Sequence, residues 1–486
     1  MIAVTSPGFV LFAALLAGLW YVCPPPRRWQ LMLGANLVFY AVLCWQALPV
    51  LLACTFLVWW CGRRTAAKGT FYAGLAAALF PLLLLKYLPA AFGWQGKLAN
   101  ALGIGYFTLQ LISYLCDVRR GKLLPEERYA RLLCYASFFL SITQGPFNRY
   151  DELMPQMDRP ARWDTARVWR GVQRSAWGYF KKLAVADRAA VVVDAVFANP
   201  AAYDRTQLLL GSVLFTVQLY ADFSGYTDIV LGGGEVLGLT LPENFRQPFF
   251  SRSISEFWQR WHITLGTWFK DYIFYPLSMS GPLKKLTARA RKRLGNHFGP
   301  LLAGAAALFC VWVCNGLWHG AGWHYLFFGM YHFALILAGN LTEPLARRVT
   351  GALHIHRERA PWKVFQILRT GLLVCVGELF FRAESLRDGL AMFRRMVTGL
   401  SLASIQNGAV YQLGMDKWDF LIVLAAVLVV LGHSMARERG AHPRQWIAGR
   451  CLPVRWAIYY SLILFLILFG AYGTGYVPVD PIYANF

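Results

Sequence analysis

Two histidines in aromatic surroundings are the strongest candidates for chemistry in this 486-residue chain. His262 lies in SRSISEFWQRWHITLGTWFKDY, where charged residues alternate with aromatic ones. His319 lies in NGLWHGAGWHYLFFGMYH, which contains three histidines and no Lys, Arg, Asp or Glu. An imidazole can take a proton from a hydroxyl or thiol near neutral pH, as general-base acyl transfer requires. We therefore predict that the two rings form one catalytic site, although a single histidine in an apolar helix more often serves packing.

The segment around His262 is too charged to face the lipid interior and too aromatic for an ordinary water-exposed loop. Irregular backbone and charges are tolerated at membrane depth only where protein or water satisfies them. We therefore expect a re-entrant or interfacial segment that lines a polar cavity. A basic connector, residues 284–293, separates it from the segment around His319.

The elements that must position these residues are membrane helices. The chain is 57% hydrophobic and only 15% charged, and the stretches between apolar segments are too short for a soluble domain. The net charge of +23 comes from Lys and Arg in short loops, a pattern that indicates membrane topology and not nucleic-acid binding. Residues 9–23 are expected to be a retained first span.

The predicted fold is an all-α polytopic membrane protein with about 10–12 transmembrane or re-entrant helices around a central funnel or tunnel. We expect one membrane-embedded domain over residues 1–486: N-terminal helices in 1–131, a catalytic core in 132–340, C-terminal helices in 341–472 and an extracytoplasmic tail in 473–486. Gly225 and Gly232 to Gly234 are expected to loosen or bend a helix.

Other chemistries lack their motifs. There is no HExxH or CxxC pattern for a metal site, and no GxSxG motif for a serine nucleophile. We predict no metal and no tightly bound cofactor.

The motifs around both histidines, with IGYFTLQLISYLCDVRRG, QLYADFSGYTDI and ELFFRAESL, resemble the bacterial branch of the membrane-bound O-acyltransferase family. That branch includes alginate O-acetyltransferase and the teichoic acid D-alanyltransferase. The resemblance covers most of the chain. It implies that His319, in the WHG motif, is the catalytic residue, and that His262, in the RWH motif, is the second active-site position.

We expect His319 to deprotonate the acceptor hydroxyl and His262 to orient the acyl carbonyl or stabilise its oxyanion. Further residues are expected to line or support the cavity: Trp261, Trp268, Trp318, His332, Asp222, Asp228, Asn244, Arg260 and Asp271.

The implied function is transfer of an acetyl group across the bacterial cytoplasmic membrane to an extracellular or cell-wall polysaccharide. The expected donor is acetyl-CoA or an acylated carrier protein on the cytoplasmic side. A separate extracytoplasmic acyltransferase, of the SGNH-hydrolase type, is the expected partner. Both termini are expected outside, and Tyr483 is either an acyl relay or part of a packed tail.

Two alternatives remain. The first is D-alanylation of teichoic acid. The second is a polytopic transporter of a polymer or lipid intermediate, which would more naturally show internal repeats.

Overall fold

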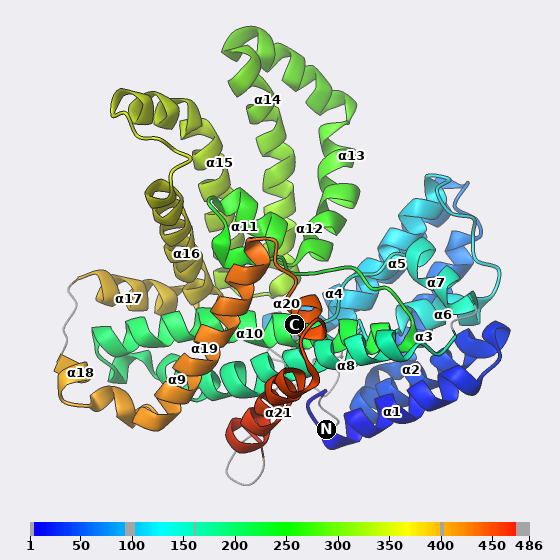
Figure 1. The fold of residues 1–486 in the computed structure, drawn as a ribbon. Helices are drawn as coiled ribbons and strands as arrows, with labels where there is room; N and C mark the ends of the chain where they lie inside the picture. The colour runs from blue at the N-terminus through cyan, green and yellow to red at the C-terminus, as the bar shows by residue number, and fades with distance from the viewer. Residues whose placement is uncertain (1–3, 93–102, 160–161, 399–402, 473–486) are drawn as a thin grey trace.

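The chain folds as a bundle of helices (Figure 1). This computed structural model describes residues 4–92, 103–159, 162–398 and 403–472. Within those ranges the only strand-like pairing is one bridge, between Phe245 and Trp261. Eight of the described helical segments are long and apolar enough to cross a membrane. The predicted all-α polytopic fold is confirmed.

The N-terminal helices form one side of the molecule, coloured blue to cyan in Figure 1. Phenylalanines join them, with Phe9 packed on Phe39 and Phe12 on Phe139 at ring separations of 6.0 and 5.4 Å. The helices are α1 (Pro7–Val22), α2 (Arg28–Cys44), α3 (Leu48–Gly62), α4 (Lys68–Phe92), α5 (Ile104–Arg119), α6 (Tyr129–Ala136) and α7 (Tyr150–Asp158).

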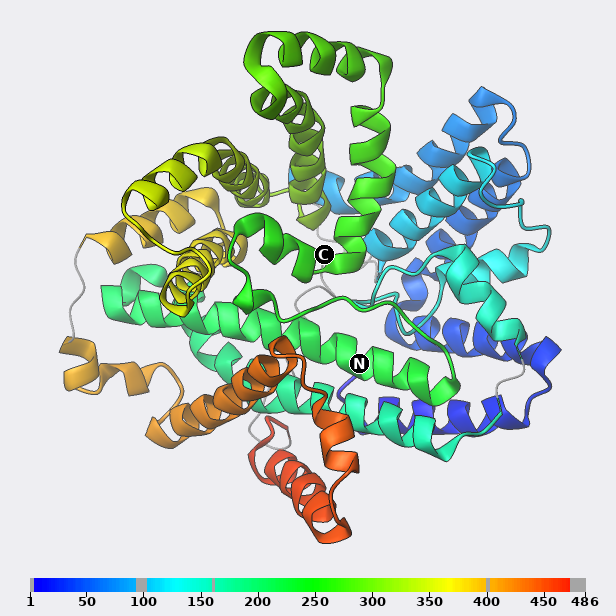
Figure 2. The same ribbon diagram turned by 45° about the horizontal axis from the view of Figure 1, so that its top comes forward.

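The centre of the fold is a pair of tightly packed helical runs. The first comprises α8 (Thr165–Tyr179), a π-helical segment η3 (Phe180–Ala186) and α9 (Asp187–Ala198), and the second is the 33-residue helix α10 (Arg205–Leu237). In both views of the ribbon they run side by side across the molecule (Figures 1 and 2).

The expected bend at the glycines of α10 is wrong, because these glycines serve close packing instead. A Cβ on Gly225 would lie 2.9 Å from the carbonyl oxygen of Gly178, and one on Gly232 would lie 2.5 Å from that of Gly171. Small residues let two membrane helices bring their backbones together. Glycine in α10 therefore permits contact with α8 while the helix stays continuous.

This packing predicts a sharp difference between two glycine substitutions. Gly232→Ala places a methyl group against the backbone of α8, and overpacking of this kind costs about 1–3 kcal/mol. Gly34→Ala in α2 meets nothing within 4 Å and should be neutral or stabilising by up to about 1 kcal/mol. Thermal unfolding in one detergent compares the two variants. Equal stability would show that α8 and α10 do not pack through their glycines.

The next part of the chain carries the two candidate motifs. It comprises α11 (Ile254–Arg260), α12 (Ile263–Phe269), a second π-helical segment η6 (Lys270–Phe274), α13 (Tyr275–Ser278), α14 (Gly281–His319) and α15 (Trp323–Ala352). The predicted basic connector, residues 284–293, is helical and belongs to the first part of α14. A non-helical Gly295, with φ of 77°, separates it from the apolar part of that helix.

The C-terminal helices lie against the central pair. They are α16 (Ala360–Arg382), α17 (Leu386–Val397), α18 (Ala403–Gln406), α19 (Lys417–Glu438), α20 (Pro443–Ala448) and α21 (Leu452–Phe469). The tail over residues 473–486, which contains Tyr483, lies outside the described residues. The proposed division of the chain and the sides of its termini stay predictions.

Candidate functional site

The structure brings His262 and His319 to the same tryptophan. The ring of Trp318 lies 6.1 Å from that of His262 and 4.9 Å from that of His319, measured between centroids. Both histidines are 3% exposed. One precedes α12 and the other ends α14, so two positions 57 residues apart in the sequence share one buried aromatic environment.

The backbone holds His262 in an uncommon conformation. The residue lies between α11 and α12 with φ of 46° and ψ of 51°, the left-handed region. For a non-glycine residue this costs on the order of 1–3 kcal/mol, and such residues cluster at functional sites. The short bridge between Phe245 and Trp261 fixes the chain on the side that precedes the histidine.

Asn244 determines which nitrogen of His262 carries the proton. Its Oδ1 accepts hydrogen bonds from the backbone N–H of Thr264 (3.1 Å) and the Thr264 hydroxyl (2.9 Å). A backbone N–H can only donate, so the atom that faces it must be the amide oxygen. His262 Nδ1 lies 3.1 Å from the same oxygen and must therefore donate to it. In the neutral ring this leaves Nε2 as the acceptor.

Asn244 is consequently a positioning residue for His262, and its removal should affect both stability and turnover. Asn244→Ala deprives three buried donors of their acceptor, and unsatisfied donors cost about 1–3 kcal/mol each, so we expect a loss of stability of about 3 kcal/mol or more. With the ring no longer oriented, kcat should fall about 10-fold or more while the KM for the donor stays nearly constant.

The control for this variant is Thr267→Ala. The Thr267 hydroxyl bonds only its own helix, at Ile263 O, and the residue is exposed. Thermal unfolding and steady-state kinetics measure both variants. If the Asn244→Ala variant had the wild-type kcat, Asn244 would not be a positioning residue for His262.

Aromatic side chains from other elements complete the surroundings of the two histidines. Phe147 stacks on His262 at 5.8 Å, and Phe223 of α10 meets it edge-on at 4.7 Å. Phe328 and Phe381 lie 6.0 and 5.0 Å from His319. None of these four residues was predicted to lie at the site. Phe223, Phe328 and Phe381 belong to the family motifs, but nothing in those motifs distinguishes them from neighbouring core aromatics.

Lys86 is a charged neighbour that the sequence analysis also missed. Its ammonium donates to the backbone carbonyl of Trp318, and it is close enough to act electrostatically on His319. The available signal was its position inside the apolar run LLLLKYL, since ionisable residues within membrane helices are usually functional.

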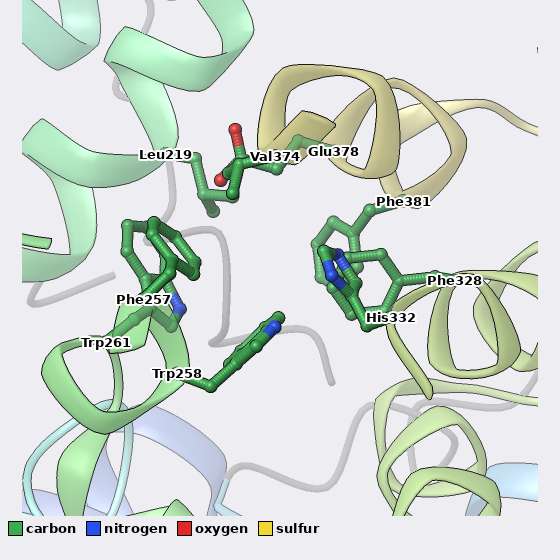
Figure 3. Close-up of a pocket in the computed structure, with 9 residues that line it drawn as sticks. All are labelled: Leu219, Phe257, Trp258, Trp261, Phe328, His332, Val374, Glu378 and Phe381. Atoms are coloured by element: carbon green, nitrogen blue, oxygen red, sulfur yellow. The ribbon is translucent and has the colours of Figure 1, made fainter. Parts of the chain in front are cut away.

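A small cavity lies near His319 (Figure 3), lined in part by Phe328 and Phe381, the two phenylalanines that contact the His319 ring. It has room for about one water molecule. His332 and Glu378 face it from α15 and α16, and Trp258 faces it from α11. Both ring nitrogens of His332, Nε1 of Trp258 and Oε2 of Glu378 lack a hydrogen-bond partner among the described residues. His332 was predicted to line the catalytic cavity, and here it lines a small cavity whose lining contains neither His262 nor His319, so its role there stays a prediction. Glu378 was not predicted.

Two of the predicted tryptophans have separate structural roles. Trp261 stacks on Phe257 at 5.4 Å and lines the same small cavity. Trp268 donates from Nε1 to the carbonyl oxygen of Leu109, at 2.9 Å, and so joins α12 to α5.

The predicted charged residues form ion pairs with neighbouring elements. Arg260 pairs with Glu256 and Glu438, each at 2.7 Å, and Asp271 pairs with Arg149 at 2.9 Å. Asp222 is buried and Asp228 half-buried on α10, and they pair with cations of η3 and α8. The role of the two aspartates at the site stays a prediction.

Sequence comparisons show the family to which this chain belongs. A model of the membrane-bound O-acyltransferase family matches residues 91–290. The probable alginate O-acetylase of Pseudomonas aeruginosa is 31% identical over 414 residues, covering 79% of this chain and 73% of that protein. The chain belongs to the membrane-bound O-acyltransferase family. It is an acyltransferase, and the resemblance predicted from the motifs is confirmed.

Members with different acceptors are also similar. The peptidoglycan O-acetyltransferase of Helicobacter pylori is 29% identical over 63% of this chain and 59% of that protein. The teichoic acid D-alanyltransferase of Bacillus subtilis is 28% identical over 58% of this chain and 71% of that protein. A multi-pass membrane acyltransferase is therefore shown.

Proposed function

We propose that this acyltransferase is an O-acetyltransferase that passes an acetyl group from a cytoplasmic thioester towards an extracytoplasmic polysaccharide. The observation that carries the proposal is the placement of two buried imidazoles on one tryptophan, Trp318, inside a membrane-embedded chain. The similarity to O-acetylases of bacterial envelope polymers supports acetyl as the group transferred.

In the proposed mechanism, His319 is the general base. It takes the proton of the acceptor hydroxyl as the oxygen attacks the acetyl carbonyl carbon. The carbon–sulfur bond then breaks, and the departing thiolate receives the proton from the imidazolium. A positioned base of this kind contributes about 10²- to 10⁴-fold to the rate.

His262 has a different role from His319. The hydrogen bond to Asn244 changes the role that we proposed for this ring from the sequence. An oxyanion needs a donor, but the neutral ring offers an acceptor at Nε2 because Nδ1–H is held by Asn244. The single proton of the acceptor hydroxyl is transferred to His319, so the neutral His262 ring neither receives that proton nor stabilises the oxyanion, and its part is to position the substrates beside it. It becomes an oxyanion donor only when the ring is protonated.

The donor, location and partner follow from this proposal. The donor is acetyl-CoA or an acylated carrier protein, the membrane is the bacterial cytoplasmic membrane, and both termini are extracytoplasmic. A separate extracytoplasmic acyltransferase of the SGNH-hydrolase type would complete transfer to the polysaccharide. Tyr483 remains a proposed acyl relay on the tail.

A reconstituted assay with three labelled donors tests the proposal. Purified protein in proteoliposomes receives acetyl-CoA, an acetylated carrier protein or a D-alanylated carrier protein, each labelled in the acyl group. We expect thioester loss and hydroxyl-ester formation with an acetyl donor. Transfer from the D-alanyl donor alone would favour the D-alanyltransferase, and movement of a polymer without ester formation would favour a transporter.

A further inference from the structure

A large cavity lies between the central helices and the C-terminal ones, apart from the two histidines. Its walls come from α8 and α10 on one side and from α19, α20 and α21 on the other, and it encloses about 1030 Å³. This is at the upper end of the range for ligand sites, ~300–1,000 Å³. In Figures 1 and 2 α19, in orange, crosses the central pair, and α21, in red, projects to one side of it, with both helices in contact with η3.

The inner wall of the cavity is electrically balanced. Arg174 pairs with Asp228 at 2.9 Å and with Glu243 at 2.6 Å, and Lys181 pairs with Asp228 at 2.7 Å. Two cations thus face two carboxylates, and this wall has no charge to offer a ligand.

The rim of the cavity carries an excess of positive charge. Arg170 and Arg444 share one carboxylate, Glu235, at 3.4 and 3.5 Å. Arg437 donates to Nδ1 of His442 at 3.1 Å. Among the described ion pairs, three guanidinium groups therefore face a single carboxylate. An anion is the complementary ligand, since guanidinium groups bind phosphate well.

The opposite end of the cavity is apolar, and part of its lining is exposed at the surface of α19 and α21. Val430 of α19 and Phe465 of α21 line it. Val429 and Ile463, also in the lining, are 52% and 46% exposed, and none of the membrane-length window of α21 is buried. Arg437 follows Val430 by seven residues on one helix, which separates the charged and apolar ends by about 10 Å.

We propose that this cavity binds one anionic phospholipid, with its phosphate against Arg437 and Arg444 and an acyl chain along Val430 and Phe465. The ligand must be an anion at one end and apolar at the other, and it must enter from the side. A phospholipid meets all three conditions. Coenzyme A meets only the first, because its pantetheine arm is polar. The inference does not depend on the transferred acyl group.

Lipid titration of the purified full chain tests this site. Phosphatidylglycerol and phosphatidylcholine, each labelled on an acyl chain, are titrated separately in one detergent. Binding of each lipid is measured by fluorescence anisotropy. Each guanidinium group contributes binding free energy by attracting the anionic headgroup. Removing two of them should therefore raise the Kd for phosphatidylglycerol about 30-fold. The variant is Arg437→Gln/Arg444→Gln. The control is Arg289→Gln/Arg293→Gln, which removes the same charge from exposed positions on α14.

We expect the cavity variant to lose its preference for phosphatidylglycerol and the α14 control to keep it. Equal loss in both variants would show diffuse attraction to the basic surface and overturn the proposal. Two competitors identify the source of the anion. Displacement of the lipid by inorganic phosphate alone would indicate a free-anion site. Displacement by coenzyme A that also depends on Arg437 and Arg444 would indicate a donor site, and both results contradict the phospholipid.

Discussion

His319→Ala is expected to lower acetyl transfer by about 10³-fold or more, because it removes the general base. The methyl group leaves a gap beside Trp318 and Phe381, the two rings that contact His319 at 4.9 and 5.0 Å. Donor binding should survive, since the change acts on proton transfer. The measurement is the initial rate of ester formation in proteoliposomes, with the KM for the donor determined in parallel.

The matched control is His324→Ala, five residues further along. His324 is also largely buried, at 9% exposure, but its ring contacts Tyr325. It should retain most of the wild-type rate. Equal losses in the two variants would mean that the aromatic packing matters and the base does not. A wild-type rate in His319→Ala would exclude His319 as the base.

Lys182→Ala is expected to destabilise the fold by about 3–5 kcal/mol, because it leaves buried carboxylates without their cation. The Lys182 ammonium lies 2.6 Å from Asp222 and 2.7 Å from Asp187, and all three side chains are at most 8% exposed. Gln144 also donates to Asp222, at 3.2 Å. The group therefore joins η3, α9 and α10 to the buried loop that follows α6.

Two further variants separate this effect from a general loss of charge. Lys182→Met/Asp222→Asn removes one carboxylate together with the cation and should recover at least half of the lost stability. Lys363→Ala, at a 40% exposed lysine paired with the 82% exposed Glu358, should leave the stability nearly unchanged, because an exposed ion pair contributes little. Thermal unfolding in detergent measures all three. A Lys182→Ala protein as stable as the Lys363→Ala protein would contradict a structural role for the buried pairs.

The proximity of the two candidate histidines could be predicted from sequence because each lies in a short, distinctive motif. Trp318 is next to His319 in one motif, and Asn244 lies in the same segment as His262. Local sequence cannot show which partner an amide will have, so the orientation of His262 by Asn244 emerged only from the structure. The resulting acceptor at Nε2 changes the role proposed for that ring.

Residues that reach the site from distant helices were missed. Lys86 arrives from α4, Phe223 from α10 and Glu378 from α16, and none is near either histidine in sequence. Lys86 carried a signal of its own, as a lone charge in an apolar run. Phe223 and Glu378 lie in QLYADFSGYTDI and ELFFRAESL, motifs that indicate the family but not which of their residues reach the histidines. Phe147 comes from a buried loop, where an apolar residue has no periodicity to interpret.

The error at the glycines of α10 has a similar cause. A glycine-rich stretch is compatible with a bend and with close helix contact, and the partner helix decides between them. The partner glycines, Gly178 and Gly171, lie 47 residues before Gly225 and 61 residues before Gly232. The basic segment at the start of α14 shows the same limit, since positive charge predicts the side of the membrane and not the backbone conformation.

The central claim is that acetyl transfer takes place between the two imidazoles beside Trp318. Its most direct test is an electron cryomicroscopy structure with a ketone analogue of acetyl-CoA, in which a methylene replaces the thioester sulfur. The account predicts that the carbonyl carbon lies within about 6 Å of a ring nitrogen of both His262 and His319, the distance that leaves room for one hydroxyl. A carbonyl held elsewhere, for example in the cavity between α8 and α21, would contradict it.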